Sequence, residues 1–471
     1  MSNEIIFKTF KTYRQFYVYD RHTNAIVILS ESEYDELQKV EKGELDYNQS
    51  SVIQKYKASG MFTPNVVKAI QHPATEIIEE YLQTRMKQLT LQVTQQCNLR
   101  CGYCAYSGIY EKNRTHSNQV MDLKTALKAI DFFLARNVEL SDVVIGFYGG
   151  EPLLEFELIQ KCVEYAKNLT EGRRLRFNMT TNGTLLTDSV IDFLVDNDFA
   201  LSISLDGSKQ EHDTNRKFAN GNGSFDVIIS NIERIQHRYP KYYEEIMILT
   251  TVNPLMDLSC ALEFFSTKEI FSDRQIIFNS MNALSSDEEL PYDESYFRIR
   301  NFEHIKTLLT LVGKLEKEYV SPLAINSRGR VEQSQKRISD HAEMASIAHH
   351  SGPCLPGIQR LFIRVDGTLF PCERVNEMLD YFKIGTIDDG VNIDNIKRIL
   401  NIGDVTEADC KNCWGLRQCS MCAGQVDFND VPTRELKLKG CHKSQDKVLS
   451  EIYELSVLNE FGFDIEELRL V

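Results

Sequence analysis

The 471-residue sequence lacks three features, and each absence excludes a class of protein. No apolar run approaches the roughly 20 residues that a membrane-spanning helix needs. The first residues, MSNEIIFKTFKTYRQF, lack the charged and then apolar plan of a secretion signal. Basic residues are not in excess, because the formal net charge is −15, whereas nucleic-acid-binding surfaces are basic. We therefore expect a cytoplasmic protein with no membrane and no nucleic-acid partner.

Length and composition predict a folded chain with more than one domain. Apolar residues make up 42% of the sequence and charged residues 26%, the balance of a globular protein. A chain of this length exceeds what one hydrophobic core normally holds. Two or three domains are expected.

Cysteine, by contrast, is abundant. Twelve cysteines in a reducing compartment point to metal binding or catalysis rather than to disulfides. Ten of them fall in two groups, within residues 97–104 and 354–441. The other two, Cys162 and Cys260, lie in apolar helical patterns and are expected to be core residues.

Residues 1–85 are predicted to form a separate small module. The alternating segments 16–20 and 25–29 flank the turn-like RHTN and predict a β-hairpin. Two short helices are expected after it, ended by Gly43 and Gly60. A hairpin followed by short helices is winged-helix-like.

Residues 86–300 alternate short β-branched runs with amphipathic helical stretches. The expected strands are 89–94, 143–148, 175–181, 200–206, 246–252 and 275–280. This alternation predicts an α/β fold with a parallel sheet, here a partial, TIM-like (β/α)6 barrel whose chemistry lies at the C-terminal strand ends. Residues 301–350 are charged and helical, and we expect them to bridge to a cysteine-rich domain of residues 351–471.

A cysteine triplet, Cys97, Cys101 and Cys104, directly follows the first expected strand. Three thiolates can hold three irons of a cubane 4Fe–4S cluster and leave one iron without a protein ligand, whereas an electron-transfer cluster normally takes four cysteines. A single zinc ion is the alternative, with His116 as the nearby candidate for a fourth ligand.

The CxxxCxxC spacing of this triplet resembles the signature of the radical S-adenosylmethionine superfamily. The resemblance implies that the cofactor's amino and carboxylate groups chelate the open iron. It also implies that one electron splits the sulfonium bond and gives a 5′-deoxyadenosyl radical that abstracts hydrogen. Residues matching the family's cofactor contacts lie near strand ends: Tyr103, Gly149, Gly150, Glu151, Asn182, Ser204 and Arg216.

The same resemblance implies a role for most of these residues. The two glycines let the backbone come close, and Glu151 accepts from the methionine ammonium group. Ser204 contacts the ribose, Arg216 pairs with the methionine carboxylate, and Tyr103 lies near the adenine. A strand-end serine and a surface arginine are the alternatives for Ser204 and Arg216.

The second cysteine group is poorly spaced for a zinc ribbon, whose paired CxxC motifs usually stand about 15–20 residues apart. It resembles the SPASM domain, which carries two auxiliary 4Fe–4S clusters in enzymes that modify peptides and proteins. One departure is that two residues, not the usual three, separate Cys419 and Cys422. By motif position, one cluster would be held by Cys410, Cys413, Cys419 and Cys441, and the other, with one iron open, by Cys354, Cys372 and Cys422.

Together the resemblances imply a peptide-modifying enzyme with S-adenosylmethionine and three 4Fe–4S clusters. The open auxiliary iron suits a substrate thiolate, because thiolate is a soft ligand. Residues 1–85 resemble elements that bind a leader peptide as an added strand, although a mere packing extension of the barrel is the alternative. The expected function is thioether crosslinking, of the sactipeptide or ranthipeptide type, in a ribosomally made Cys-containing precursor. Ferredoxin or flavodoxin is the expected reductant.

Other functions stay open at this point. A sulfatase maturase would oxidise a cysteine or serine to formylglycine, with Glu373, directly after Cys372, as a candidate base. Those enzymes generally carry aspartate there and lack the front module. A carbon–carbon crosslinking maturase is a further possibility, and a metal-bearing peptide-binding protein without catalysis is the non-enzymatic one.

Overall fold

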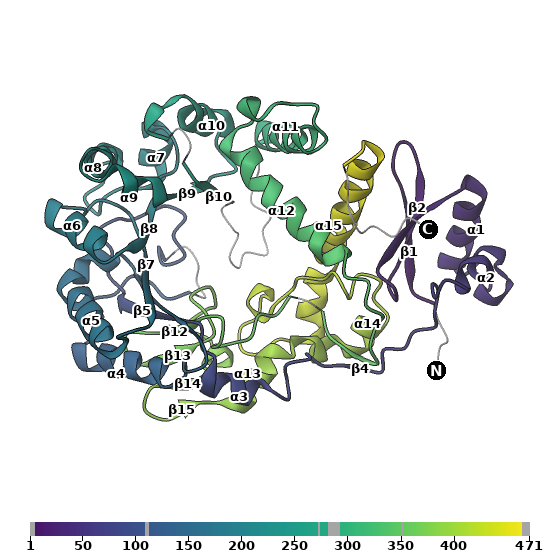
Figure 1. The fold of residues 1–471 in the computed structure, drawn as a ribbon, viewed down its shortest axis with the longest axis horizontal. Helices are drawn as coiled ribbons and strands as arrows, with labels where there is room; N and C mark the ends of the chain where they lie inside the picture. Colours follow the sequence, from purple (N-terminus) through teal and green to yellow (C-terminus); the bar gives the residue numbers. More distant parts are fainter. Residues whose placement is uncertain (1–4, 109–112, 272–273, 281–292, 351, 464–471) are drawn as a thin grey trace.

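A ten-stranded sheet forms the centre of the molecule in a computed structural model that describes residues 5–108, 113–271, 274–280, 293–350 and 352–463 (Figure 1). Six parallel strands make up its larger part: β5 (Gln88–Thr94), β6 (Asp142–Gly149), β7 (Arg174–Thr181), β8 (Phe199–Ser204), β9 (Met247–Val252) and β10 (Ile276–Ser280). Each lies within two residues of the range that its apolar pattern predicts, and the α/β class is confirmed.

Helices connect these strands and cover the outer side of the sheet (Figure 1). They are α4 (Leu123–Leu134), α5 (Phe156–Leu169), α6 (Asp188–Asp196), α7 (Lys209–Asn215), α8 (Phe225–Arg238), α9 (Pro240–Glu245) and α10 (Leu258–Thr267). Cys162 on α5 is fully buried, as expected. The prediction for Cys260 is wrong, since it is exposed. The apolar face of α10 runs through Leu258, Ala261 and Phe265, so Cys260 falls on the opposite side of the helix.

The sheet continues beyond the six predicted strands. β12 (Leu361–Ile363) pairs in parallel with β5, and β13 (Thr368–Phe370), β14 (Gly385–Thr386) and β15 (Gly390–Val391) follow as antiparallel neighbours. These strands have two or three residues each, too few for an apolar pattern to reveal them. The cysteine-rich region and the parallel sheet are therefore joined through hydrogen bonds between β5 and β12.

A second, antiparallel sheet lies near the N-terminus: β1 (Phe7–Lys11), β2 (Phe16–Asp20) and β3 (Ala25–Leu29). The predicted hairpin is β2–β3, while β1 was not predicted. Two helices follow, α1 (Glu31–Glu41) and α2 (Ser51–Lys57). Ser30 caps α1 in a capping box with Glu33, which fixes where this helix begins.

This small sheet is covered on both faces, because successive side chains of a strand point to opposite sides. Val18 and Val27 join the cluster that packs on α1 and α2. Tyr17, Tyr19 and Ile26 join a different cluster that includes residues of α12 (Pro322–Ile338) and α15 (Arg434–Glu460). Only the sheet edges are left for a further strand.

The remaining elements link these parts. They are β4 (Ala69–Ile70), α3 (Ile78–Thr84), α11 (Glu294–Leu311), β11 (Ile347–Ala348), α13 (Ile393–Leu400) and α14 (Glu407–Lys411). β4 pairs in parallel with β11.

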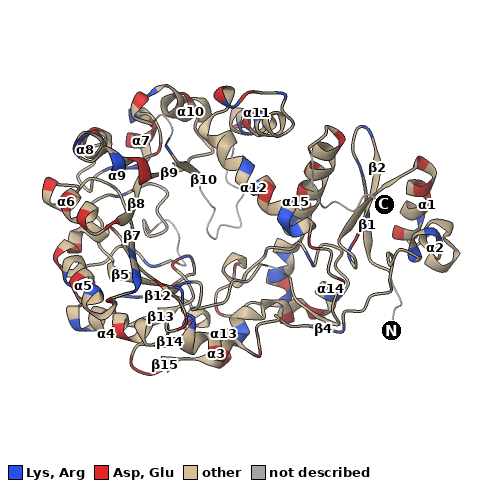
Figure 2. Cartoon of the chain, viewed as in Figure 1, with Lys and Arg blue, Asp and Glu red and all other residues tan. Residues whose placement is uncertain are grey.

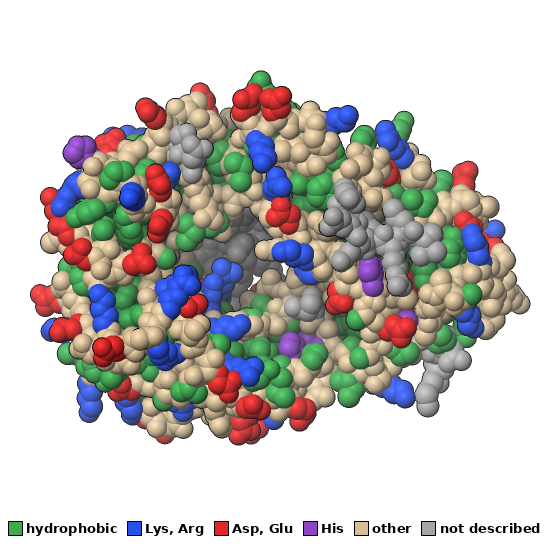
Figure 3. Space-filling model, viewed as in Figure 1, with side chains coloured by type: hydrophobic (Ala, Val, Ile, Leu, Met, Phe, Trp, Pro, Cys, Tyr) green, Lys and Arg blue, Asp and Glu red, His purple; other side chains and the backbone are tan. Residues whose placement is uncertain are grey.

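Acidic and basic side chains are interspersed over the outer helices (Figure 2). The face seen in Figure 3 is hollowed near its middle, with Lys and Arg side chains close to the hollow. Within the described residues, no helix is both long and apolar enough to span a bilayer.

Candidate functional site

The structure brings Cys97, Cys101 and Cys104 together in the loop after β5. Burial raises the pKa of Cys97 to about 12 and that of Cys101 to about 11, and the neighbouring thiols of the triplet add to the rise at Cys97. Backbone bonds fix the loop, for example from Gly102 N to Asn215 O at 2.9 Å. The triplet is thus one compact set of thiol donors, and loading metal onto it must release their protons.

Two glycines at the end of β6 let this loop pack closely. A Cβ on Gly150 would lie well inside 3.0 Å of Gln96 O, and one on Gly149 would collide with Thr94 O. Gly149 also has φ +152°, which favours glycine. Glycine at both positions therefore allows the end of β6 to lie directly against the backbone that enters the cysteine loop.

Glu151 is buried at the ends of β6 and β7. It accepts hydrogen bonds from Asn182 N and Thr181 Oγ1, each at 2.7 Å, and from Leu153 N at 3.1 Å. Burial raises its pKa to about 7, although these hydrogen bonds oppose the shift. A carboxylate has about four acceptor positions, so roughly one is left for a ligand ammonium group.

Arg216 and Tyr103 both donate to Asp206, a residue to which the sequence prediction gave no role. Asp206 Oδ2 accepts from Arg216 Nε at 2.8 Å and from the Tyr103 hydroxyl, while Oδ1 accepts from Thr251 N at 2.9 Å. Burial disfavours the charge of Arg216, but Asp206, Tyr103 and Cys101 together outweigh burial, and the pKa of Arg216 is raised. The position of Asp206 two residues after β8 was the signal in the sequence. Arg216 is buried, which contradicts the alternative of a surface arginine.

Asn182 and Ser204 lie at the ends of the neighbouring strands. The Asn182 amide donates to Asn98 Oδ1 at 2.8 Å and lies 3.9 Å from Cys97 Sγ. Ser204 is buried at the end of β8. Asn182 thus lies beside the cysteine loop.

The geometry of the cysteine triplet fits an iron–sulfur cluster better than a single metal ion. His116 Nε2 lies 3.9 Å from Cys104 Sγ. Within the described part of the chain, however, no three Cys, His, Asp or Glu side chains are close enough to hold one metal ion. A zinc ion would draw four donors to within about 2.3 Å of one centre, whereas a cubane spreads three thiolates over three irons.

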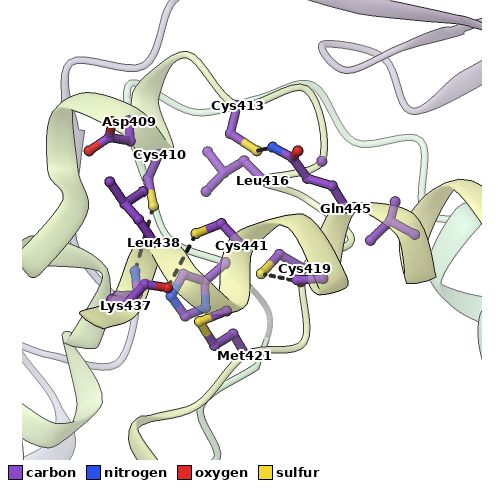
Figure 4. A pocket seen from close by; sticks show the side chains of 14 residues that line it. Asp409, Cys410, Cys413, Leu416, Cys419, Met421, Lys437, Leu438, Cys441 and Gln445 are labelled. Carbon is purple, nitrogen blue, oxygen red and sulfur yellow. Dashed lines mark hydrogen bonds between the residues drawn. The ribbon is translucent and has the colours of Figure 1, made fainter. Parts of the chain in front are cut away.

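Four cysteines of the second group surround a common cavity of about 80 Å³ (Figure 4). They are Cys410, Cys413, Cys419 and Cys441. Burial raises the pKa of Cys441 to about 11, and the other three thiols contribute to the rise. We call this group the four-cysteine site.

The remaining three cysteines form a second set, which we call the three-cysteine site. Burial raises the pKa of Cys372 to about 11, with added effects of Cys354 and Cys422, so the three lie near one another. Cys354 is exposed. Glu373 is ion-paired with Arg360, and its Oε2 is buried without a hydrogen-bond partner among the residues that the structure describes.

A buried network near the cysteine loop was missed by the sequence prediction. Glu377 accepts from Arg114 Nε at 3.0 Å and from the Gln92 amide at 3.0 Å. The Arg114 guanidinium lies 3.6 Å from the centre of the Tyr106 ring. No sequence signal connects Arg114 with Glu377, because 263 positions separate them.

Comparison with known proteins places this geometry in a family. The model of the radical SAM superfamily matches residues 91–257. An uncharacterized protein of Methanocaldococcus jannaschii is 31% identical over 230 residues, which are 49% of this chain and 72% of the relative. A cysteine-type anaerobic sulfatase-maturating enzyme of Clostridium novyi is 27% identical over 346 residues, 70% of this chain and 86% of the relative.

A radical SAM cyclopropyl synthase, TigE of Paramaledivibacter caminithermalis, is 26% identical over 204 residues, 41% of this chain and 39% of the relative. The solved structure of native anSMEcpe with bound AdoMet shares the fold, with a TM-score of 0.59 and 21% identity over 79% of this chain and 99% of that one. A further structure of anSMEcpe holds AdoMet and the Cp18Cys peptide and has a TM-score of 0.56. The chain belongs to the radical SAM superfamily and is related to the anaerobic sulfatase-maturating enzymes.

Proposed function

We propose that this protein forms thioether crosslinks in a ribosomally made, Cys-containing precursor peptide. The observation that carries the proposal is the three-cysteine site, where three protein thiols would leave one iron of a cubane for another ligand. Cys354 is exposed, so this site is open to an incoming chain. A substrate thiolate is a suitable ligand for that position, because soft ligands favour iron–sulfur centres.

Family membership supports S-adenosylmethionine and one 4Fe–4S cluster as cofactors. Cys97, Cys101 and Cys104 would hold that cluster. The bound cluster and cofactor would supply a carbon radical that removes hydrogen from the substrate. The four-cysteine and three-cysteine sites would hold two further clusters, as in SPASM domains.

The chain's own residues would bind and orient S-adenosylmethionine at the strand ends. Asp206 fixes the Arg216 guanidinium through Nε, and Arg216, which also contacts Cys101, would pair with the methionine carboxylate through a remaining nitrogen. Tyr103 is held by the same carboxylate, which fixes its ring for contact with the adenine. Glu151 would accept from the methionine ammonium group at its remaining acceptor position.

Four more residues would complete this binding site. Gly149 and Gly150 hold the end of β6 against the cysteine loop and would offer their backbone to the cofactor there, and Ser204 would contact the ribose. Asn182 would support the cluster side of the site, because its amide lies 3.9 Å from Cys97 Sγ.

The N-terminal sheet is proposed to bind the leader of the precursor. Its two faces are covered by helices, and on the outer edge of β1 Thr9 N donates to Glu41 Oε2 at 3.1 Å, which leaves the β3 edge as the better place for an added strand. It also lies beside the four-cysteine site, since Arg21 Nη1 donates to Lys411 O at 2.7 Å and to Cys413 O at 3.2 Å. The peptide bound in one anSMEcpe structure supports a peptide partner for this chain. Ferredoxin or flavodoxin would supply electrons.

Sulfatase maturation is the second candidate, favoured by the similarity to the Clostridium novyi enzyme over most of its length. Glu373 would then be the base beside Cys372. Its ion pair with Arg360 holds the carboxylate near the three-cysteine site.

One experiment separates the two candidates. Anaerobically reconstituted enzyme is incubated with reductant, S-adenosylmethionine and either a Cys-containing precursor or a sulfatase-type peptide. Thioether formation should lower the precursor mass by two hydrogens per link, and Cys354→Ala should abolish the links while 5′-deoxyadenosine still forms. Formylglycine on the sulfatase peptide, with an unchanged precursor, would overturn the thioether proposal.

A further inference from the structure

Lys437 is buried against the four-cysteine site. The residue is 1% exposed, which is rare for lysine. Its Nζ donates to Thr406 Oγ1 at 2.6 Å. It also donates to Cys410 Sγ at 3.7 Å (Figure 4). The ammonium group therefore contacts the thiol of Cys410.

No carboxylate compensates this charge at close range. Among the described residues, no acidic side chain forms an ion pair with Lys437 within 4.0 Å. Asp404 and Asp409 interact with it electrostatically from farther away, and Asp409 is paired with Arg434 at 2.6 Å. A buried cation without an ion-pair partner is strongly unfavourable, and thiolates in this site would compensate the charge of Lys437 at shorter range than Asp404 or Asp409 do.

The position of Lys437 on its helix makes the buried charge still less favourable. Lys437 lies in the first turns of α15, where the positive end of the helix dipole disfavours a cation. Cys441, Ser444 and Gln445 follow at intervals of four, seven and eight residues, so they share one face of the helix. This face carries Lys437, Cys441 and two polar residues that contact other thiols of the site. Ser444 Oγ lies 3.1 Å from Cys419 Sγ, and Gln445 Nε2 lies 3.4 Å from Cys413 Sγ.

Lys437 is the Lys or Arg side chain that lines this cavity, and a second buried cation, Arg21, donates to Cys413 O from outside it. His350 also lines it, but burial lowers the pKa of His350 well below its ordinary value, so its ring is neutral.

The charges around the three-cysteine site are different. Its neighbouring cations, Arg360 and Arg374, are 40% and 80% exposed and pair with Glu373. Water screens such charges, whereas burial leaves the charge of Lys437 much less screened.

We propose that Lys437 is a positioning residue for electron transfer, which raises the reduction potential of a 4Fe–4S cluster held by Cys410, Cys413, Cys419 and Cys441. An added electron makes the cluster more negative, and an adjacent buried ammonium group stabilises that state. The four-cysteine site is then more easily reduced than it would be without Lys437. This inference rests on the proposed cluster ligands.

The test compares the anaerobically reconstituted full-length protein with three variants. Lys437→Met removes the charge and keeps the length of the side chain, while Lys437→Arg keeps the charge. Lys439→Met is the matched control, because Lys439 lies on the same helix but is exposed. Iron and sulfide content, circular dichroism and redox titration followed by electron paramagnetic resonance are measured for each.

With about twelve irons per chain, Lys437→Met should lower one of the midpoint potentials. The ratio of reduced to oxidised cluster at a fixed potential should fall at least tenfold, which is about 59 mV for one electron. Lys437→Arg and Lys439→Met should keep the wild-type potentials. Loss of about four irons in Lys437→Met but not in Lys437→Arg would also support a role of the charge.

Two outcomes would overturn the inference: unchanged potentials in fully loaded Lys437→Met, or equal changes in Lys437→Met and Lys437→Arg. Failure of the ligand assignment is recognised separately. In that case Cys410→Ala together with Cys441→Ala would leave the wild-type iron content unchanged.

Discussion

Gly150→Ala tests the close packing between the end of β6 and the cysteine loop. The added Cβ would have to move away from Gln96 O by about 1 Å to reach 3.0 Å, and it would also lie 3.0 Å from Cys97 N. Both atoms belong to the backbone, so no side-chain rotation relieves the collision. Overpacking of this kind costs about 1–3 kcal/mol.

The displacement acts directly on a proposed cluster ligand, because Gln96 precedes Cys97. A misplacement of about 1 Å at a reacting centre lowers rates by roughly 100-fold. We therefore expect Gly150→Ala to lose about four irons per chain, or to keep them and form 5′-deoxyadenosine about 100-fold more slowly. Iron analysis and chromatographic detection of 5′-deoxyadenosine measure both effects.

Gly102→Ala is the matched control. Gly102 lies inside the cysteine loop, yet its added Cβ would meet no atom within 4 Å. This variant should keep wild-type iron content and near wild-type rate. If Gly150→Ala also behaved like wild type, the packing argument would be refuted.

Two further predictions concern the buried carboxylates of the site. Burial raises the pKa of Glu151 from 4.5 to about 7, so the folded state favours its protonated form. The contribution of this proton to the free energy of unfolding is fully present below pH 4.5 and is lost as the pH rises through 7. In cofactor-free protein, raising the pH from 4.5 to 7 should increase the unfolding free energy of Glu151→Gln relative to that of the wild type by up to about 3 kcal/mol. Parallel pH profiles of the two proteins in urea would contradict this. Asp206→Asn should destabilise the protein by about 3–5 kcal/mol because it leaves the Arg216 charge buried without its partner, and adding Arg216→Met should recover part of the loss. Equal urea midpoints for Asp206→Asn and wild type would argue against a buried ion pair of that strength.

Apolar periodicity was sufficient to predict the parallel strands. Each of the six runs is five to eight residues long in the structure and is bounded by polar or glycine-containing segments, so the pattern is visible locally. Cys260 shows the limit of this approach. Its apolar neighbours indicated a buried helix, but which side of α10 faces the sheet depends on packing.

Short strands could not be predicted, for a related reason. β12 to β15 have two or three residues each and are specified by their hydrogen-bond partners rather than by their own composition. Their partners include β5, which lies more than 260 positions earlier in the chain. Only the folded arrangement brings these segments together.

The sequence by itself determined the first candidate donor set, Cys97, Cys101 and Cys104, because ligand spacing within a loop is a local property. The resemblance to SPASM domains predicted how the other seven cysteines divide into two sets. The sequence also determined the strand that precedes the first set and the glycines at the end of β6. The tertiary structure decided which charges surround these sets: Asp206 against Arg216, Glu377 against Arg114, and Lys437 against Cys410. Such pairings depend on burial and on contacts between distant segments, because a charge acts strongly only where water is excluded.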